Sequence, residues 1–499
     1  MRGRTTTGRK RKRRLLTLLI LVVSSGLATI SLSTVPTSDA YTTALANART
    51  TEGVRLVSKC NRLRSIKLHQ RINYPLLHST TAGNRMDPSL QADDLPSHST
   101  AESSTGNSCP FSKPFKRYRI PLSSSKDSDK SASKPLLPFL RAMQRSAVRR
   151  KLETKHQNVK WLEGVRDGVQ VVSLLYETAV LVLQDQIINE CTVVLPDAST
   201  RVVRQWVDIF EWMTTMQQED AVTTAGQTNA EFGTLEDISF VTLKRVEPSP
   251  TLLDPFVELN PDLIEKRTKS WVKRVLVDLG ICPFTKSPIK SGQGLADVGV
   301  PVANIAYHSC LTGSPQNWLP LFADTWKAIT EMIEAGPSGK NGISSILLAA
   351  PLFDDDFDAW AGPIFAILEA TVVAAGAEDR LGVVCFHPLY ATPDGSTFPG
   401  FGHMHSLPRL EQWIKETTAE GTESFDDGCS LSTSDIAAGG AWQRRTPHAT
   451  INVLRAEQLA AAESRRNTPN LYSRNIMTLI KEVGLNALKD ALDQERAMT

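Results

Sequence analysis

The sequence predicts an α/β protein: a layered sandwich with a partly parallel four-stranded sheet, preceded by a helical segment and a disordered N-terminal region. Four apolar segments of strand length occupy residues 302–308, 343–350, 381–386 and 449–454. Two segments with apolar residues at helical spacing, 318–334 and 357–375, separate the first three. Strands that alternate with helices are typical of parallel pairing through right-handed crossovers.

The first 40 residues predict a signal for the secretory pathway. A basic run at 9–14 is followed directly by the apolar stretch 15–23 and then by small residues up to Ala40. This order is typical of a cleaved signal peptide. The alternative is an uncleaved membrane anchor, because residues 15–32 are about long enough to cross a bilayer, although Ser, Gly and Thr interrupt them.

Residues 41–135 predict a transit-peptide-like stretch and a disordered linker. Positions 41–90 are rich in Ser, Thr and Arg and poor in acids, which is typical of a plastid transit peptide behind a signal peptide. Positions 91–134 are rich in Ser, Pro, Lys and Asp, with too few apolar residues to offset the entropy of ordering. We therefore expect delivery to a plastid, with secretion or a single-pass membrane anchor as the alternative.

The composition excludes several classes of site. The 499 residues carry a formal charge of +3, and the seven cysteines are odd in number and form no Cys-x-x-Cys pair, which excludes a disulfide scaffold and a zinc module. No dinucleotide, phosphate-loop, serine-nucleophile or zinc-protease motif is present, so the sequence specifies neither a cofactor nor a metal site. We expect no nucleic-acid partner, and a membrane contact only if the N-terminal segment remains an anchor.

Residues 136–217 predict a helical segment, and 218–258 predict a polar linker with one strand at 238–246. After Ser199, a suitable N-cap, one apolar stripe follows at helical spacing. Its members are Val202, Trp206, Ile209, Phe210 and Met213. We expect this stripe to be buried in a helical bundle or against the main domain. The alternative is a helix that binds a protein partner.

The main α/β domain is predicted at 259–487. Asn260 and Pro261 form a helix start, with Pro at the first helical position, and Gly280 ends that helix. Thr468 and Pro469 start the last helix of the domain.

Candidate catalytic residues follow the predicted strands. The carboxyl ends of the first three strands bring together His308, the acids at 354–356 and His387, and ligands bind at this edge of open α/β sheets. We predict His387 and Asp355 as catalytic residues, because imidazole and carboxylate groups serve as general acid and base. The proline after His387 restricts this residue to an extended conformation, which we expect to aim its ring outward. The alternative is that the acids cap the following helix.

A thiol and several cations complete the predicted site. Cys282 is a candidate nucleophile, although it follows a helix C-terminus whose dipole disfavours a thiolate, so activation would need a cation such as Lys286. The alternative is a buried Cys-Pro-Phe turn. Arg444 and Arg445 precede the fourth strand and are placed to bind a carboxylate or phosphate, with Arg445 as the candidate site residue and His448 beside it. A solvated pair of arginines is the alternative.

In the last helix, Asn475 shares the core-facing side with Leu471 and Leu479. A buried amide must find hydrogen-bond partners. We therefore predict Asn475 and the adjacent Arg474 first as a structural anchor and second as ligand contacts.

The order of short motifs in the main domain resembles one family. The motifs are Trp271, Leu-Gly-Ile-Cys-Pro-Phe at 279–284, Phe-His-Pro at 386–388, Arg-Thr-Pro at 445–447, the segment 450–455, and Tyr-x-Arg-Asn-Ile at 472–476. Together they resemble the bacterial, algal and plant family named domain of unknown function 1415, over residues 262–485. The resemblance implies a domain and not a reaction, because no activity is established for that family.

Departures from the family pattern lie beside two candidate residues. Where members carry Asn-Arg-Ser-Pro-Tyr-Pro-Thr, this chain has Arg444, His448 and Ala449, which puts any role of the family's Asn or Tyr in doubt and retains Arg445. The segments 287–301 and 391–443 look like insertions relative to the compact bacterial form.

The leading hypothesis is a small-molecule enzyme or an anion-binding domain. Its pocket would collect His387, Arg445, an acid of the 354–356 run and Cys282. The rival is a non-enzymatic assembly or protein-interaction module that uses residues 136–217 as its contact surface.

Residues 1–90 fused to a fluorescent reporter should carry the reporter into the plastid when expressed in an alga with a secondary plastid. Both parts of the leader are then present, whereas a control fusion of residues 41–90 lacks the signal and should remain in the cytosol. Fluorescence microscopy reads the outcome. Secretion of the 1–90 fusion would refute plastid delivery.

Overall fold

The computed structural model of the protein describes residues 136–184, 188–220, 228–246, 259–396, 400–419, 431–464 and 468–499. These residues belong to one compact unit, Leu56–Thr499. The predicted signal segment, transit-peptide-like stretch and linker at 1–135 lie outside the described residues.

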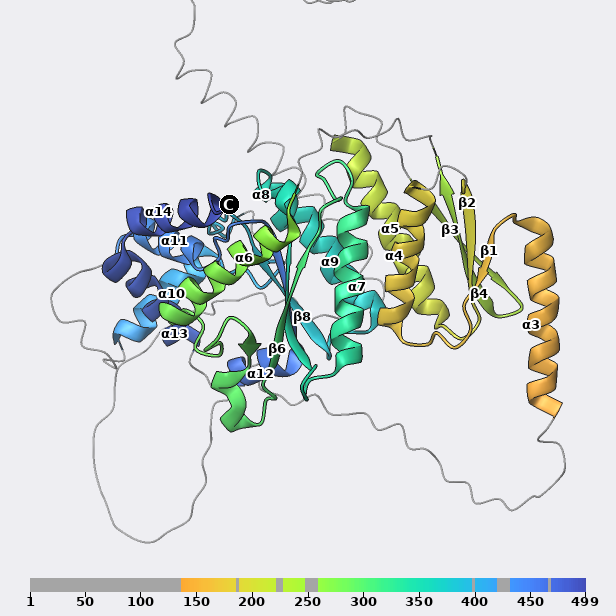
Figure 1. Cartoon of the computed structure of the whole chain (residues 1–499), viewed down its shortest axis with the longest axis horizontal. Coiled ribbons are helices and arrows are strands. Elements are labelled where there is room, and N and C mark those ends of the chain that lie inside the picture. Colours follow the sequence, from red (N-terminus) through yellow and green to blue (C-terminus); the bar gives the residue numbers. More distant parts are fainter. Residues whose placement is uncertain are drawn as a thin grey trace, which may run out of the picture. The chain divides into compact units, whose positions relative to one another are not determined.

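The chain forms two β-sheets (Figure 1). The first, sheet A, contains β1 (Val159–Trp161), β2 (Glu190–Leu195), β4 (Ile238–Arg245) and β3 (Thr228–Leu235), in that spatial order. The second, sheet B, contains β5 (Lys290–Ser291), β6 (Ala303–Ser309), β7 (Ile343–Ala349), β9 (Thr450–Arg455) and β8 (Leu381–Phe386), in that order.

Sheet B is partly parallel, as predicted. Strands β6 and β7 pair in parallel, whereas β9 pairs antiparallel with both β7 and β8, so β6, β7 and β8 run in one direction. The four predicted strands are the four long ones, each within one residue of its predicted bounds. The two-residue strand β5 was not predicted.

Twelve α-helices are present in the described part of the chain, eleven of them before residue 478. They are α3 (Leu136–Lys155), α4 (Gly168–Gln184), α5 (Thr200–Asp220), α6 (Pro261–Trp271), α7 (Leu319–Ala335), α8 (Phe357–Ala359), α9 (Phe365–Ala375), α10 (Leu407–Ala419), α11 (Thr433–Trp442), α12 (Ala456–Ser464) and α13 (Thr468–Met477). A further helix, α14 (Leu485–Arg496), follows and extends beyond the predicted end of the main domain at 487. The helix start at Asn260 is confirmed, because its side chain accepts hydrogen bonds from the amides of Asp262 and Leu263.

The two faces of sheet B are covered differently because successive side chains of a strand point to opposite faces. Ile346 and Leu348 of β7 pack in the large core that includes α7, α9, α4 and α5. Leu347, on the other face, packs with Trp271 of α6 and Leu488 of α14. All seven residues of β7 are buried, which is typical of a strand covered on both sides.

Residues 136–217 contain the predicted helices but also two strands, β1 and β2, that the sequence analysis missed. The strand β2 is a short apolar run between helices, and periodicity cannot distinguish such a run from a buried helical turn. In the linker, the predicted strand is β4, and β3 pairs with it as a hairpin. The turn residues Glu236 and Asp237 both have positive φ, a conformation usually signalled by Asn-Gly, so the hairpin carried no sequence signature.

The apolar stripe of α5 is core rather than a free contact surface. Trp206 is fully buried, and the centre of its ring lies 5.2 Å from the ring centre of Tyr176 and 4.8 Å from that of Phe210. The helices α4 and α5 pack against α7 and α9, so the N-terminal and main parts share one hydrophobic core.

Replacing Trp206 by Ala should lower the free energy of unfolding by about 3–5 kcal/mol, because the change leaves a large cavity in the shared core. Chemical denaturation followed by circular dichroism should show one transition for the whole described region, shifted to lower denaturant. The control Leu181→Ala, at an exposed position of α4, should change little. Two separate transitions, with only one shifted, would contradict a shared core.

Candidate functional site

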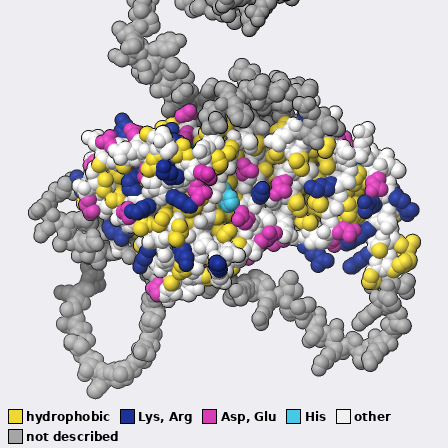
Figure 2. All heavy atoms as spheres, in the orientation of Figure 1, with side chains coloured by type: hydrophobic (Ala, Val, Ile, Leu, Met, Phe, Trp, Pro, Cys, Tyr) yellow, Lys and Arg dark blue, Asp and Glu magenta, His cyan; other side chains and the backbone are white. Residues whose placement is uncertain are grey.

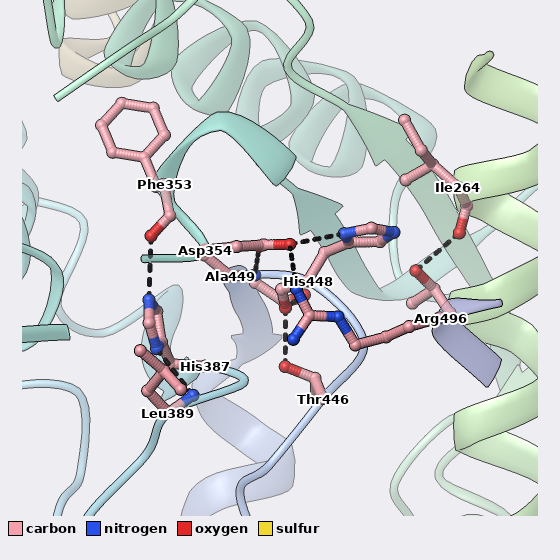
Figure 3. Close-up of polar contacts among 11 residues, drawn as sticks. Ile264, Phe353, Asp354, His387, Leu389, Thr446, His448, Ala449 and Arg496 are labelled. Atoms are coloured by element: carbon pink, nitrogen blue, oxygen red, sulfur yellow. Dashed lines mark hydrogen bonds and ion pairs between the residues drawn. The ribbon is translucent and has the colours of Figure 1, made fainter. Parts of the chain in front are cut away.

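Two groups of polar residues flank sheet B. The first, which we call the edge cluster, consists of Asp354, His387, His448 and Arg496 at the carboxyl ends of β7 and β8 (Figure 3). The second lines a cleft on the face of sheet B opposite to α7 and α9. The sequence predicted residues in both groups.

Asp354 is the centre of the edge cluster. Its carboxylate accepts hydrogen bonds from Nδ1 of His448 at 2.9 Å and from the amide of Ala449 at 2.7 Å, and Arg496 of α14 lies 3.6 Å away (Figure 3). The other ring nitrogen of His448, Nε2, is buried and has no hydrogen-bond partner among the residues that the structure describes. The carboxylate therefore joins the end of β7, the start of β9 and the C-terminal helix.

His387 is buried, and its ring does not point outward as the sequence analysis expected. Its exposed fraction is 0%, its Nε2 donates to the carbonyl of Phe353 at 2.9 Å, and its Nδ1 accepts from the amide of Leu389 at 3.0 Å. Burial lowers the pKa of His387. The extended backbone before Pro388 is compatible with an inward ring because the loop after β7 supplies the acceptor.

The other residues predicted at this edge are dispersed. Asp355 is exposed, while Asp356 caps α8 by accepting from the amide of Ala359. His308 lies within β6, and its Nε2 is 3.5 Å from a carboxylate oxygen of Glu331 in α7. The structure therefore brings Asp354, His387 and His448 to one edge.

Arg445 is half-buried and lies outside the cleft lining. Its Nε donates to the carbonyl of Tyr390 at 3.1 Å, and its guanidinium stacks 4.8 Å from the ring centre of Trp442. Burial lowers the pKa of Arg445.

The cleft has a volume of about 1090 Å³. Its floor is formed by alternate residues of four strands: Ile305, Ser345, Leu347, Asn452, Leu454, Val384 and Phe386. Its polar walls include Cys282, Lys286, Ser291, His403, His405, Thr417, Gln443, Arg444, Gln458, Tyr472, Arg474 and Asn475. Among the lining residues that the structure describes, Lys286, Arg444 and Arg474 are cationic, and none is Asp or Glu.

Arg444 is the most buried cation of the cleft, with 7% of its surface exposed. Its Nη1 donates to the carbonyls of Cys385 at 3.2 Å and Gly402 at 3.1 Å, and its Nη2 donates to the carbonyl of His403. Among its described contacts no carboxylate is present: besides the carbonyl groups, it contacts the side chain of Tyr472 and the rings of Phe386 and Tyr390. A cation without a carboxylate partner in a partly desolvated cleft attracts an anion more strongly than the same charge in water.

Asn475 holds the loop that carries Cys282. Its Nδ2 donates to the carbonyl of Ile281 at 2.9 Å and to Oε1 of Gln443 at 3.0 Å, which confirms the predicted anchor. Arg474 donates to the carbonyl of Gly280 at 2.7 Å, where a positive φ ends the helical segment as predicted. The thiol of Cys282 lies 3.6 Å from the hydroxyl of Thr285.

An aromatic group forms one wall of the cleft. The ring of His405 lies 4.8 Å from Tyr472 and 4.9 Å from Trp413, nearly perpendicular to Tyr472. Burial lowers the pKa of His405 to about 3, and the charge of Arg444 contributes to this shift. His405 therefore remains neutral at physiological pH and does not add to the positive charge of the cleft.

Four of the eight predicted site residues meet in the cleft: Cys282, Lys286, Arg474 and Asn475. His387, His448, Asp355 and Arg445 do not line it. His403 and His405 were not predicted. Arg444 was predicted together with Arg445 as an anion-binding or solvated pair, but only Arg445 was taken as a site residue, although Arg444 is the arginine that faces the cleft.

The described residues contain no group of three or more His, Cys, Asp or Glu side chains that could hold a metal ion. The cleft offers cations, amides and hydroxyls instead, which suit an anionic organic molecule.

Residues 263–397 match the model of a family described as a protein of unknown function (DUF1415). The match confirms the expected family over a shorter range than 262–485. It covers β6, β7, β8 and the Cys282 loop, and it ends before Arg444 and α13. No curated protein and no solved structure matches the chain significantly.

Acidification should destabilise the protein through His405. The unfolded chain binds a proton below pH 6.5, whereas the folded chain keeps His405 neutral down to about pH 3, so stability is lost as pH falls through this window. The slope is at most about 1.4 kcal/mol per pH unit, and partial exposure reduces it. Urea denaturation between pH 7.5 and 4.5 should show a shallower dependence for His405→Phe. Equal slopes in both proteins would contradict the burial of a neutral ring.

Proposed function

We propose that the cleft on sheet B binds a small organic anion, such as a carboxylate or a phosphate ester. The observation that carries this proposal is the charge of the lining, whose described residues include Lys286, Arg444 and Arg474 and no Asp or Glu. A cavity lined by one sign of charge with low-dielectric walls raises the local concentration of the opposite sign.

The apolar part of the cleft suits the organic portion of a ligand, in addition to its charge. The floor alternates apolar residues, such as Leu347 and Val384, with a polar pair in which Ser345 donates to Oδ1 of Asn452 at 3.0 Å. Small-molecule sites typically combine apolar walls with few, well-placed polar groups. The ligand would therefore place its apolar part over the strands and its charge towards the arginine.

The two charges at the mouth have different roles. Lys286 is exposed, so its amine is placed to attract an incoming anion. Arg474 is exposed too, but it already donates to the carbonyl of Gly280 and to Oδ1 of Asn475. Cys282 shares this mouth, which makes it the candidate nucleophile if the bound anion also reacts.

Delivery remains a separate proposal that rests on the sequence alone. We propose that residues 1–90 carry the protein through the secretory route to a plastid. The composition of this leader supports the proposal.

Replacing the cleft cations should weaken the binding of anilinonaphthalene sulfonate, an apolar anion that fluoresces when bound. Lys286→Gln should weaken it by about fivefold, the effect of roughly 1 kcal/mol for one solvent-screened charge. Arg444→Gln should weaken it further because that charge is less screened. A fluorescence titration measures both affinities.

Arg445→Gln is the matched control, because the neighbouring arginine points to Tyr390 and Trp442 and does not line the cleft. Its affinity should equal that of the unaltered protein. The exposed Lys286 variant keeps the test valid if Arg444→Gln fails to fold. Equal affinities in Lys286→Gln and Arg445→Gln would remove the proposal.

A further inference from the structure

The first turns of α3 project without any packing partner among the described residues. Phe139, Leu140 and Met143 are 61%, 54% and 55% exposed and belong to none of the hydrophobic clusters. The helix is anchored only further along, where Val148 and Leu152 pack on Val194 and Ile238 of sheet A. Figure 2 shows hydrophobic side chains gathered over the start of α3, next to Lys and Arg side chains.

The exposed apolar residues lie on one face of the helix. Phe139 and Met143 are separated by four residues, about one turn, and Leu140 lies beside them. This face is turned away from Val148 and Leu152, since those residues lie about half a turn round from Phe139. Arg150 lies eleven positions after Phe139, about three turns further on, and therefore on the same face.

The charge of α3 points to the chemistry of a partner. The helix carries six basic residues and a single acid, Glu153. Three of the basic residues form ion pairs: Arg145 with Asp197, Arg149 with Glu153, and Lys151 with Glu236. Arg141, Arg150 and Lys155 are exposed and have no ion pair among the described residues. Arg150 lies on the apolar face and is available to an anionic surface there, whereas Arg141 and Lys155 lie seven positions before and after Val148, about two turns away, and therefore on the opposite side of the helix.

We propose that the start of α3 docks on an anionic lipid surface. A helix with Phe, Leu and Met on one face and Arg and Lys around it lies in the membrane interface, with the apolar side chains among the acyl chains and the cations at the phosphates. Charge complementarity selects this occupant, because anionic headgroups match unpaired guanidinium groups. The cleft of sheet B lies across sheet B from α7 and α9 and takes no part in this contact.

Hydrogen exchange of the full chain tests the proposal in the presence of vesicles of 30% phosphatidylserine in phosphatidylcholine. Mass spectrometry reads the exchange on peptides that cover residues 138–147. This local readout is needed because the N-terminal leader could bind vesicles by itself. The backbone amides of residues 138–147 should exchange more slowly in the presence of these anionic vesicles. Vesicles of pure phosphatidylcholine should leave the exchange rate unchanged. The protection should disappear in Phe139→Ser/Leu140→Ser/Met143→Ser. Arg150→Gln should need about fivefold more lipid, because it removes the unpaired guanidinium on the apolar face.

Lys340→Gln is the charge-matched control, since this lysine is exposed in the main domain, and it should keep the protection. Three results would overturn the proposal. They are unchanged exchange with anionic vesicles, equal protection by neutral vesicles, and protection that rises with protein concentration without lipid, which would indicate a second copy of the chain.

Discussion

The guanidinium of Arg444 is a full positive charge held inside the protein by carbonyl oxygens rather than by a carboxylate. Its hydrogen bonds to Cys385, Gly402 and His403 tie the edge strand β8 to the segment beside it. The adjacent Gln443 continues the network through Asn475 to the loop of Cys282. The cleft walls therefore depend on a cation that has no carboxylate partner among the described residues.

The edge cluster has a different part in the structure. Asp354 joins the ends of β7 and β9 to Arg496, and Arg274 forms a two-pronged ion pair with Glu495, which is almost completely buried. Both contacts fix α14 against the domain. A buried carboxylate that loses its partner is costly, so these pairs specify where the C-terminal helix docks.

The sequence predicted the strands of sheet B because long apolar runs, helix caps and glycine ends are local signals, as at Asn260 and Gly280. Sheet A was missed in part, because β2 is short and apolar, and because the turn between β3 and β4 lacks a sequence signature. The site was half predicted. Cys282 and Asn475 could be found from their motifs, but nothing local distinguishes Arg444, which faces the cleft, from Arg445, which does not. Tertiary contacts determine which of the two arginines faces the cleft.

A crystal of the protein soaked in bromide tests the central claim most directly, because the anomalous signal locates bound anions without any assumption about the natural ligand. The account predicts a bromide peak inside the cleft on sheet B, near the guanidinium of Arg444 and the amine of Lys286. Bromide peaks elsewhere on the surface together with an empty cleft would contradict it.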